Sequence, residues 1–142
     1  MNPFALHHGV LHAEGLALPE IAARYGTPTY VYSRNAILEA FAAYGRGLQG
    51  RRSLVCYAMK ANSNLSVLRT LAQAGAGFDI VSGGELARVL AAGGDPAKVV
   101  FSGVGKTSDE MAAALHAGIH CFNIESEAEL DTVSRIAASK GR

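Results

Sequence analysis

The chain has 142 residues, of which 49% are hydrophobic and 18% charged, a composition typical of a globular protein that buries a core. Its formal net charge is +1 and both signs are spread along the chain, so it offers neither a basic stripe for nucleic acid nor a polybasic patch for a membrane surface. No signal-peptide pattern opens the sequence, and no apolar run approaches the roughly 20 residues of a membrane span. We therefore expect a cytoplasmic protein that acts on small molecules.

The segment before residue 50 is rich in turns. Extended runs over residues 12–19 and 26–32 flank a short predicted helix over residues 20–25. A longer helix is predicted over residues 33–44, with Ser33 as its N-cap. We expect this segment to be a leader that precedes the main domain.

Beyond residue 50, short β-type runs alternate with longer amphipathic stretches. Strands are predicted at residues 54–59, 78–81, 99–101 and 121–124. Helices are predicted to start near Ser63, Ser82, Thr107 and Ser126. A glutamate stands three residues after each of the last three of these residues, which predicts three capping boxes. Alternating strands and helices of this kind indicate a parallel sheet with crossover helices.

The repeat by itself fits either an open sheet or a closed barrel. No Gly-x-Gly-x-x-Gly follows the first strand to favour a dinucleotide fold. A closed barrel requires eight βα units, whereas this pattern predicts about four, and a half-barrel leaves two open parallel edges. We therefore expect a truncated chain rather than a complete domain.

The cysteines and the N-terminal histidines give no clear sign of a metal site. Cys56 and Cys121 lie in apolar runs without a short-spaced partner, which predicts buried free thiols. His7, His8 and His12 lack the carboxylate or cysteine partners of a metal site, so we expect them to be solvated or to cap backbone groups.

Residues 103–107, Gly-Val-Gly-Lys-Thr, are similar to the end of a phosphate-binding P-loop. That motif requires a glycine five positions before Gly105, where Val100 stands, so the spacing excludes it. We expect a tight loop that caps a helix, with Lys106 in solvent. The position of Lys106 after a strand leaves a role in an active site open.

Lys60 directly follows the apolar run 54–59. If the strand continues, Leu54, Cys56 and Ala58 share the face of Lys60, and the two small residues leave space for a flat ring beside it in a barrel interior. The structural alternative is a lysine that snorkels at a strand end. The chemistry that best uses such an amine is imine formation with a carbonyl, because an amine near apolar walls loses its proton readily.

Two carboxylates lie at or just beyond the end of the next strand, where they could orient Lys60 or a cofactor. Glu85 already occupies the last position of the Ser82 capping box, which explains it as a helix cap. Asp79 has no such local role, and an acid inside an apolar strand is usually paired.

Five segments together resemble the pyridoxal-phosphate decarboxylases of the alanine-racemase-like barrel fold. They are residues 25–33, 57–64, 78–86, 101–107 and 121–127, and they occur in the family's order over nearly the whole chain. The resemblance implies an α/β chain that forms the N-terminal portion, about four βα units, of a (β/α)8 TIM barrel. Residues 33–142 would be the first half of that barrel, and residues 1–32 the N-terminal segment of a β-domain.

The resemblance also implies a cofactor and a reaction. Lys60 matches the lysine that holds pyridoxal 5′-phosphate and would be the catalytic residue, while Ala58, Asp79 and Glu85 would join it in binding the cofactor, without a metal. Residues 103–107 and 121–126 look closest to the branch that decarboxylates meso-2,6-diaminopimelate to L-lysine and carbon dioxide, the last step of lysine biosynthesis.

Other functions stay open at this point. One is a related decarboxylase of ornithine, arginine or carboxynorspermidine, and another is a non-catalytic protein that binds pyridoxal phosphate or a partner with the same barrel. The resemblance implies a small amino acid as substrate and a homodimer for the full-length protein. The family's phosphate cradle and substrate-recognition groups lie in later sequence, so we expect residues 1–142 alone to be inactive.

Overall fold

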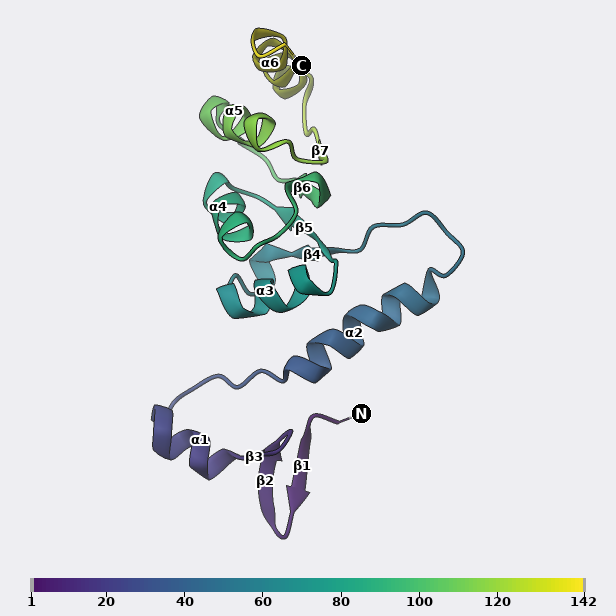
Figure 1. Cartoon of the computed structure of the whole chain (residues 1–142). Helices are drawn as coiled ribbons and strands as arrows, with labels where there is room; N and C mark the ends of the chain where they lie inside the picture. Colours follow the sequence, from purple (N-terminus) through teal and green to yellow (C-terminus); the bar gives the residue numbers. More distant parts are fainter. Residues whose placement is uncertain (1, 142) are drawn as a thin grey trace. The chain divides into compact units, whose positions relative to one another are not determined.

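A computed structural model describes residues 2–141, which fall into two compact units that divide between Gly47 and Leu48 (Figure 1). Within this range, no helix is both long enough and apolar enough to cross a membrane.

The N-terminal unit begins with a three-stranded antiparallel sheet in the order β1-β2-β3. Its strands are β1 (Phe4–His7), β2 (Val10–Ala13) and β3 (Leu16–Ala17). The tight turns place His8 and Glu14 at positive φ angles of 51° and 53°. The turn-rich leader expected from the sequence is therefore partly a small meander of strands.

Two helices complete this unit, α1 (Leu18–Tyr25) and α2 (Arg34–Gly47). A proline stands in the first turn of α1. Proline is tolerated there because the backbone N–H groups of a first turn have no acceptor within the helix. The Oγ atom of Ser33 accepts a hydrogen bond from Ala36 N at 3.0 Å, which confirms the predicted N-cap of α2.

The C-terminal unit is a parallel sheet in the order β4-β5-β6-β7, in which each strand is followed by an α-helix (Figure 1). The strands are β4 (Cys56–Ala58), β5 (Gly77–Ile80), β6 (Val99–Phe101) and β7 (Cys121–Phe122). The helices are α3 (Leu65–Gln73), α4 (Gly83–Ala91), α5 (Ser108–Ala117) and α6 (Glu127–Ser139), with short 3-10 helices η1 (Met59–Ala61) and η2 (Pro96–Lys98). The predicted run of four βα units is confirmed, and it is consistent with the first part of a barrel.

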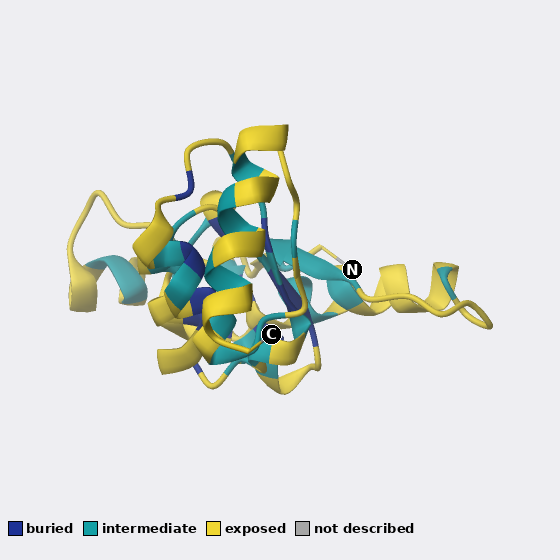
Figure 2. Cartoon of the chain, turned by 90° about the horizontal axis from the view of Figure 1, so that it is seen from above, coloured by how far each residue is buried: buried dark blue, intermediate teal, exposed yellow. Residues whose placement is uncertain are grey.

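The two faces of this parallel sheet differ in burial, and Figure 2 marks the buried, half-buried and exposed segments along the chain. On one face Phe78, Ile80, Val99 and Phe101 have no exposed surface, because α3, α4 and α5 bury their apolar residues on that side. The other face carries the register row Ala58, Asp79, Val100 and Cys121, whose members are half-buried or, for Cys121, exposed. Strand alternation thus separates a packed core from an open face.

The helix caps differ in detail from the prediction. Asn64 rather than Ser63 caps α3, since Asn64 Oδ1 accepts from Ser66 N at 2.9 Å. Of the three predicted capping boxes, the one at Thr107 is complete, since the Glu110 carboxylate accepts from Thr107 N at 3.0 Å.

The other two predicted boxes are half formed. Ser82 and Ser126 cap their helices, but the glutamate of each reaches one residue further back and accepts from Val81 N at 2.7 Å or from Glu125 N at 2.8 Å. The N-cap φ is −157° at Ser82 and −159° at Ser126, against −78° at Thr107. We attribute the difference to this extended backbone, which presents the preceding N–H to the carboxylate.

Candidate cofactor site

Lys60 lies just after β4, at the carboxyl end of the parallel sheet. The predicted strand over 54–59 is wrong at both ends, because β4 spans only Cys56–Ala58 and Lys60 belongs to η1. The alternation that was expected to carry Lys60 onto the face of Ala58 therefore stops two residues short. In the structure, η1 lies against β5, Met59 is fully buried and Lys60 is exposed.

The amine of Lys60 has no partner: among residues 2–141 it makes no hydrogen bond and no ion pair. A snorkelling lysine also fits this exposure. What it provides is a primary amine free to react at the edge of the open face.

Asp79 lies on that open face, directly beside Ala58 in the register of β4 and β5. The sequence led us to expect a paired acid, and this is confirmed, since Asp79 Oδ1 accepts a 2.5 Å hydrogen bond from Ser102 Oγ. Ser102 Oγ in turn accepts from Asn123 Nδ2 at 2.9 Å. Three polar side chains from neighbouring strands or strand ends are thus linked at the carboxyl edge of the sheet.

Sequence reasoning missed Ser102 and Asn123. A signal was present for Ser102, because it is the first residue after the predicted strand 99–101, which β6 confirms. Asn123 was expected inside a strand over 121–124, but β7 ends at Phe122, so Asn123 is also the first residue after its strand. The carboxyl ends of parallel strands meet at one edge of a sheet, so polar residues at these positions are candidates to meet.

Cys56 lies beside Gly77 in the register of β4 and β5, towards the amino end of the strands. Partial burial and, second, the negative charge of Asp79 raise the pKa of its thiol above the ordinary value. The prediction of free thiols is confirmed, but the prediction that both are buried is wrong. Cys56 is half-buried and Cys121 is exposed, because β7 is the edge strand of the described sheet and only two residues long.

Glu85 is used locally. Its Oε2 accepts from Val81 N at 2.7 Å, and its own N–H donates to Ser82 Oγ at 3.2 Å. The interpretation as a helix-capping residue is therefore supported. These bonds also hold one carboxylate oxygen at the point where the chain leaves β5.

Lys106 differs most from its prediction. We expected it in solvent, but its side chain is completely buried. Its Nζ donates to Gly103 O at 2.7 Å, to Asn123 O at 2.7 Å and to Glu129 Oε1 at 2.6 Å. The hydrogen bond from Lys106 is the main reason that the pKa of Glu129 is lowered from its ordinary value. With every proton of its ammonium engaged, Lys106 ties the β6–α5 loop to the start of α6 and is not available for chemistry.

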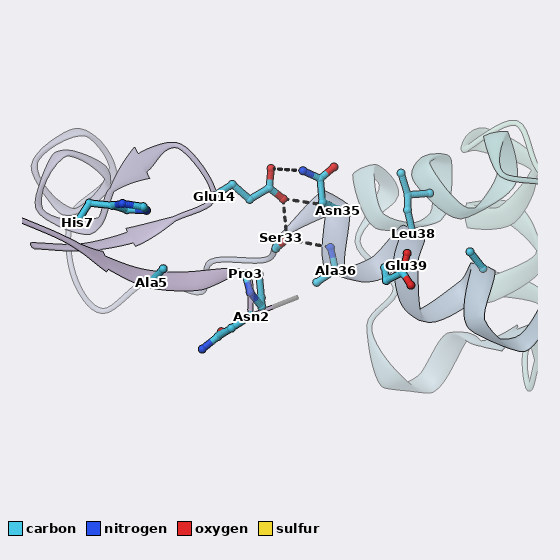
Figure 3. A pocket seen from close by; sticks show the side chains of 11 residues that line it. Asn2, Pro3, Ala5, His7, Glu14, Ser33, Asn35, Ala36, Leu38 and Glu39 are labelled. Carbon is cyan, nitrogen blue, oxygen red and sulfur yellow. Dashed lines mark hydrogen bonds between the residues drawn. The ribbon is translucent and has the colours of Figure 1, made fainter.

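The N-terminal unit holds a pocket of about 1030 Å³ (Figure 3). In its lining, Glu14 accepts from Ser33 Oγ at 2.6 Å and from Asn35 N at 2.9 Å, and these bonds lower the pKa of the Glu14 carboxyl. The pocket lining is mostly apolar and includes no lysine and none of the predicted site residues. In the described part of the chain, no group of three or more histidine, cysteine or acidic residues could hold a metal ion.

The open face suits a flat carbonyl compound attached to Lys60. The amine is free, and Ala58, two residues before Lys60, presents only a methyl group beside Asp79 in the sheet. Gly77 adds no side chain to this face, and a Cβ at that position would lie 2.7 Å from Cys56 Sγ. Pyridoxal phosphate, with an aldehyde and a planar ring, fits this donor set.

Comparison with known proteins gives a consistent family. Residues 34–141 match the family model described as "Pyridoxal-dependent decarboxylase, pyridoxal binding domain". The diaminopimelate decarboxylase of Pseudomonas aeruginosa is 62% identical over 141 residues, which is 99% of this chain and 34% of that protein.

Solved structures agree. The crystal structure of Helicobacter pylori diaminopimelate decarboxylase complexed with L-lysine has a TM-score of 0.84 and 47% identity, over 87% of this chain and 32% of that one. Arginine decarboxylase of Paramecium bursaria Chlorella virus is more distant, with a TM-score of 0.70 and 26% identity over 84% of this chain and 32% of that one. The chain spans about a third of the length of the relatives it matches.

Proposed function

Since the chain belongs to the family of pyridoxal-dependent decarboxylases, we propose that Lys60 is the residue to which pyridoxal 5′-phosphate attaches and that the full-length protein decarboxylates meso-2,6-diaminopimelate to L-lysine and carbon dioxide. By full-length protein we mean this chain together with any sequence that adjoins it. The observation that carries the proposal is the unpaired amine of Lys60 at the carboxyl edge of the sheet, next to a face with little side-chain bulk.

Ala58, Asp79 and Glu85 would join Lys60 in holding the cofactor. Ala58 leaves room for the ring, and the Asp79 carboxylate supplies a negative charge on the same face. One carboxylate oxygen of Glu85 already accepts a hydrogen bond from Val81 N. The role of Glu85 would therefore be to hold the backbone at the end of β5.

The chemistry divides between the cofactor and this chain. When bound, pyridoxal phosphate supplies an electron sink for the pair left by the departing carboxylate. Lys60 Nζ would hold the cofactor, and as a primary amine at this edge it could also carry a proton to the substrate. Asp79 would favour the protonated form of a nitrogen near it.

The choice of substrate rests on the relatives. Identity to the diaminopimelate decarboxylase of Pseudomonas aeruginosa is 62%, against 26% for the viral arginine decarboxylase. The L-lysine bound to the Helicobacter pylori relative is also the product of the proposed reaction. A related decarboxylase of ornithine, arginine or carboxynorspermidine is the second candidate, and a non-catalytic protein with the same cofactor is the third.

We further propose that the full-length protein is a cytoplasmic homodimer and that residues 1–142 alone are inactive. The family resemblance supports the dimer. The inactivity of residues 1–142 is supported by their coverage of only about a third of the length of the related enzymes. Light scattering after gel filtration measures the oligomeric state, and carbon dioxide release by residues 1–142 measures whether this part is active. A monomeric active protein, or robust turnover by residues 1–142, would refute the respective statement.

The function is tested by carbon dioxide release from meso-2,6-diaminopimelate, ornithine, arginine and carboxynorspermidine, each offered to the full-length protein with pyridoxal phosphate. We expect diaminopimelate to be preferred and Lys60→Ala to abolish its turnover. Lys140→Ala is the matched control, since Lys140 is exposed and its side chain has no partner within residues 2–141. Preference for another substrate refutes the diaminopimelate assignment, and an active Lys60→Ala variant refutes the site.

A further inference from the structure

A line of three side chains crosses the carboxyl edge of the sheet from β7 to β5. Asn123 Nδ2 donates to Ser102 Oγ at 2.9 Å, and Ser102 Oγ donates to Asp79 Oδ1 at 2.5 Å. The serine hydroxyl has a single proton. Because the Asn123 amide already donates to its oxygen, that proton is directed to Asp79.

The line ends on one oxygen of the Asp79 carboxylate. Hydrogen bonds to a carboxylate are the stronger, charge-assisted kind. Oδ2, the other oxygen, accepts no hydrogen bond from any residue that the structure describes. The bond on Oδ1 therefore fixes the rotation of the carboxylate and leaves Oδ2 available on the open face.

The backbone holds both donors in place. Ser102 N donates to Ile80 O at 2.8 Å, which continues the pairing of β5 with β6 beyond the end of β6. Asn123 N donates to Phe101 O at 2.9 Å in the same way, and Asn123 O receives the buried ammonium of Lys106 at 2.7 Å. Lys106 thus anchors the outer end of the line.

We propose that Ser102 and Asn123 are positioning residues for Asp79, which fix the rotation of its carboxylate so that Oδ2 can face the cationic nitrogen of a cofactor attached at Lys60. This inference rests on the proposed function, because it needs Lys60 as the attachment point and Asp79 as its neighbouring charge. Neither residue acts on the substrate. The titratable side chains that share this face with Asp79 are Cys56 of β4 and Cys121 of β7.

The test compares four variants of the full-length protein: Ser102→Ala, Ser102→Thr, Asn123→Asp and Asp79→Asn. Asn123→Asp keeps nearly the same side-chain shape, but it offers the single proton of the Ser102 hydroxyl a second carboxylate acceptor. Ser102→Thr keeps the hydroxyl. Ser66→Ala is the matched control, because Ser66 is exposed and its hydroxyl has no partner among the described residues.

Two readouts do not depend on turnover. The first is the affinity of the apoprotein for pyridoxal phosphate, measured by fluorescence titration, which we expect to fall about 3- to 10-fold in Ser102→Ala and Asn123→Asp, the worth of roughly one hydrogen bond. The second is the pH at which the visible absorbance of the loaded protein changes. Loss of a fixed negative charge near a cationic nitrogen lowers this pH, by about one unit or more in Asp79→Asn and by less in Ser102→Ala. Asn123→Asp adds a carboxylate, so this variant is compared by its affinity alone.

The inference is supported if Ser102→Ala shifts both readouts, and Asn123→Asp the affinity, in the direction of Asp79→Asn while Ser102→Thr and Ser66→Ala stay close to wild type. It is overturned if Asp79→Asn shifts the readouts and Ser102→Ala and Asn123→Asp do not, or if Asp79→Asn has no effect. Lys60→Ala reports on the proposed function separately, since the visible absorbance should vanish there whatever Ser102 does. Thermal unfolding of each variant separates these effects from loss of fold, and Asn123→Asp serves as the test should Ser102→Ala not fold.

Discussion

Replacing Lys106 by methionine should destabilise the C-terminal unit more than any surface lysine change. The side chain is completely buried, and its ammonium donates to Gly103 O, Asn123 O and Glu129 Oε1 at 2.6 to 2.7 Å. Methionine keeps an apolar stem of similar length but leaves these three acceptors without their donor.

The size of the effect follows from the burial of the pair. Removing one partner of a buried ion pair costs about 3–5 kcal/mol, because the other charge is left uncompensated. The Glu129 side chain retains 10% exposure, so water can reach it in part. We therefore expect Lys106→Met to lower the free energy of unfolding by about 3 kcal/mol, at the lower end of that range.

Denaturant unfolding of the full-length protein measures this difference. Lys140→Met serves as the control for a lysine in solvent and should change stability by less than about 0.5 kcal/mol. Adding Glu129→Gln to Lys106→Met removes the stranded charge, so the double variant should be more stable than the sum of the two single losses predicts. A loss below about 1 kcal/mol for Lys106→Met, or strict additivity in the double variant, would show that the ion pair does not stabilise these loops.

Two further changes test the loop and sheet contacts. The pKa of Glu110 is lowered chiefly by the hydrogen bond from Gly83 N and next by the one from Thr107 N, so its contribution to stability is present above the ordinary carboxyl pKa and is lost as the pH falls through the lowered value. Wild type should therefore exceed Glu110→Gln in stability at pH 7, and the gap should close in acid; a gap independent of pH contradicts this account. Gly77→Ala would place a Cβ 2.6 Å from Lys98 O and 2.7 Å from Cys56 Sγ, and should cost about 1–3 kcal/mol in denaturant unfolding, whereas Gly45→Ala, with open space around it, should not.

Much of the fold could be predicted because its signals are local. The order of strands and helices follows from hydrophobic periodicity, and the N-caps Ser33, Ser82, Thr107 and Ser126 are each read from a few adjacent residues. The paired state of Asp79 also follows from a single residue in an apolar strand.

The errors arose where distant segments decide the outcome. Lys106 donates to acceptors 17 and 23 residues further along the chain, and no local sequence pattern predicts these contacts. The turn into η1 after Ala58 ends the strand earlier than its apolar run suggests, so alternation could not place Lys60. Ser102 and Asn123 meet only because their strands are neighbours in the sheet.

The most direct test of the central claim is to locate the cofactor chemically. Borohydride reduction of the full-length protein loaded with pyridoxal phosphate fixes the cofactor to the amine that holds it, and peptide mass spectrometry then identifies the residue. We predict the reduced adduct on Lys60. An adduct on Lys98, Lys106 or Lys140 instead, with Lys60 unmodified, would contradict the account.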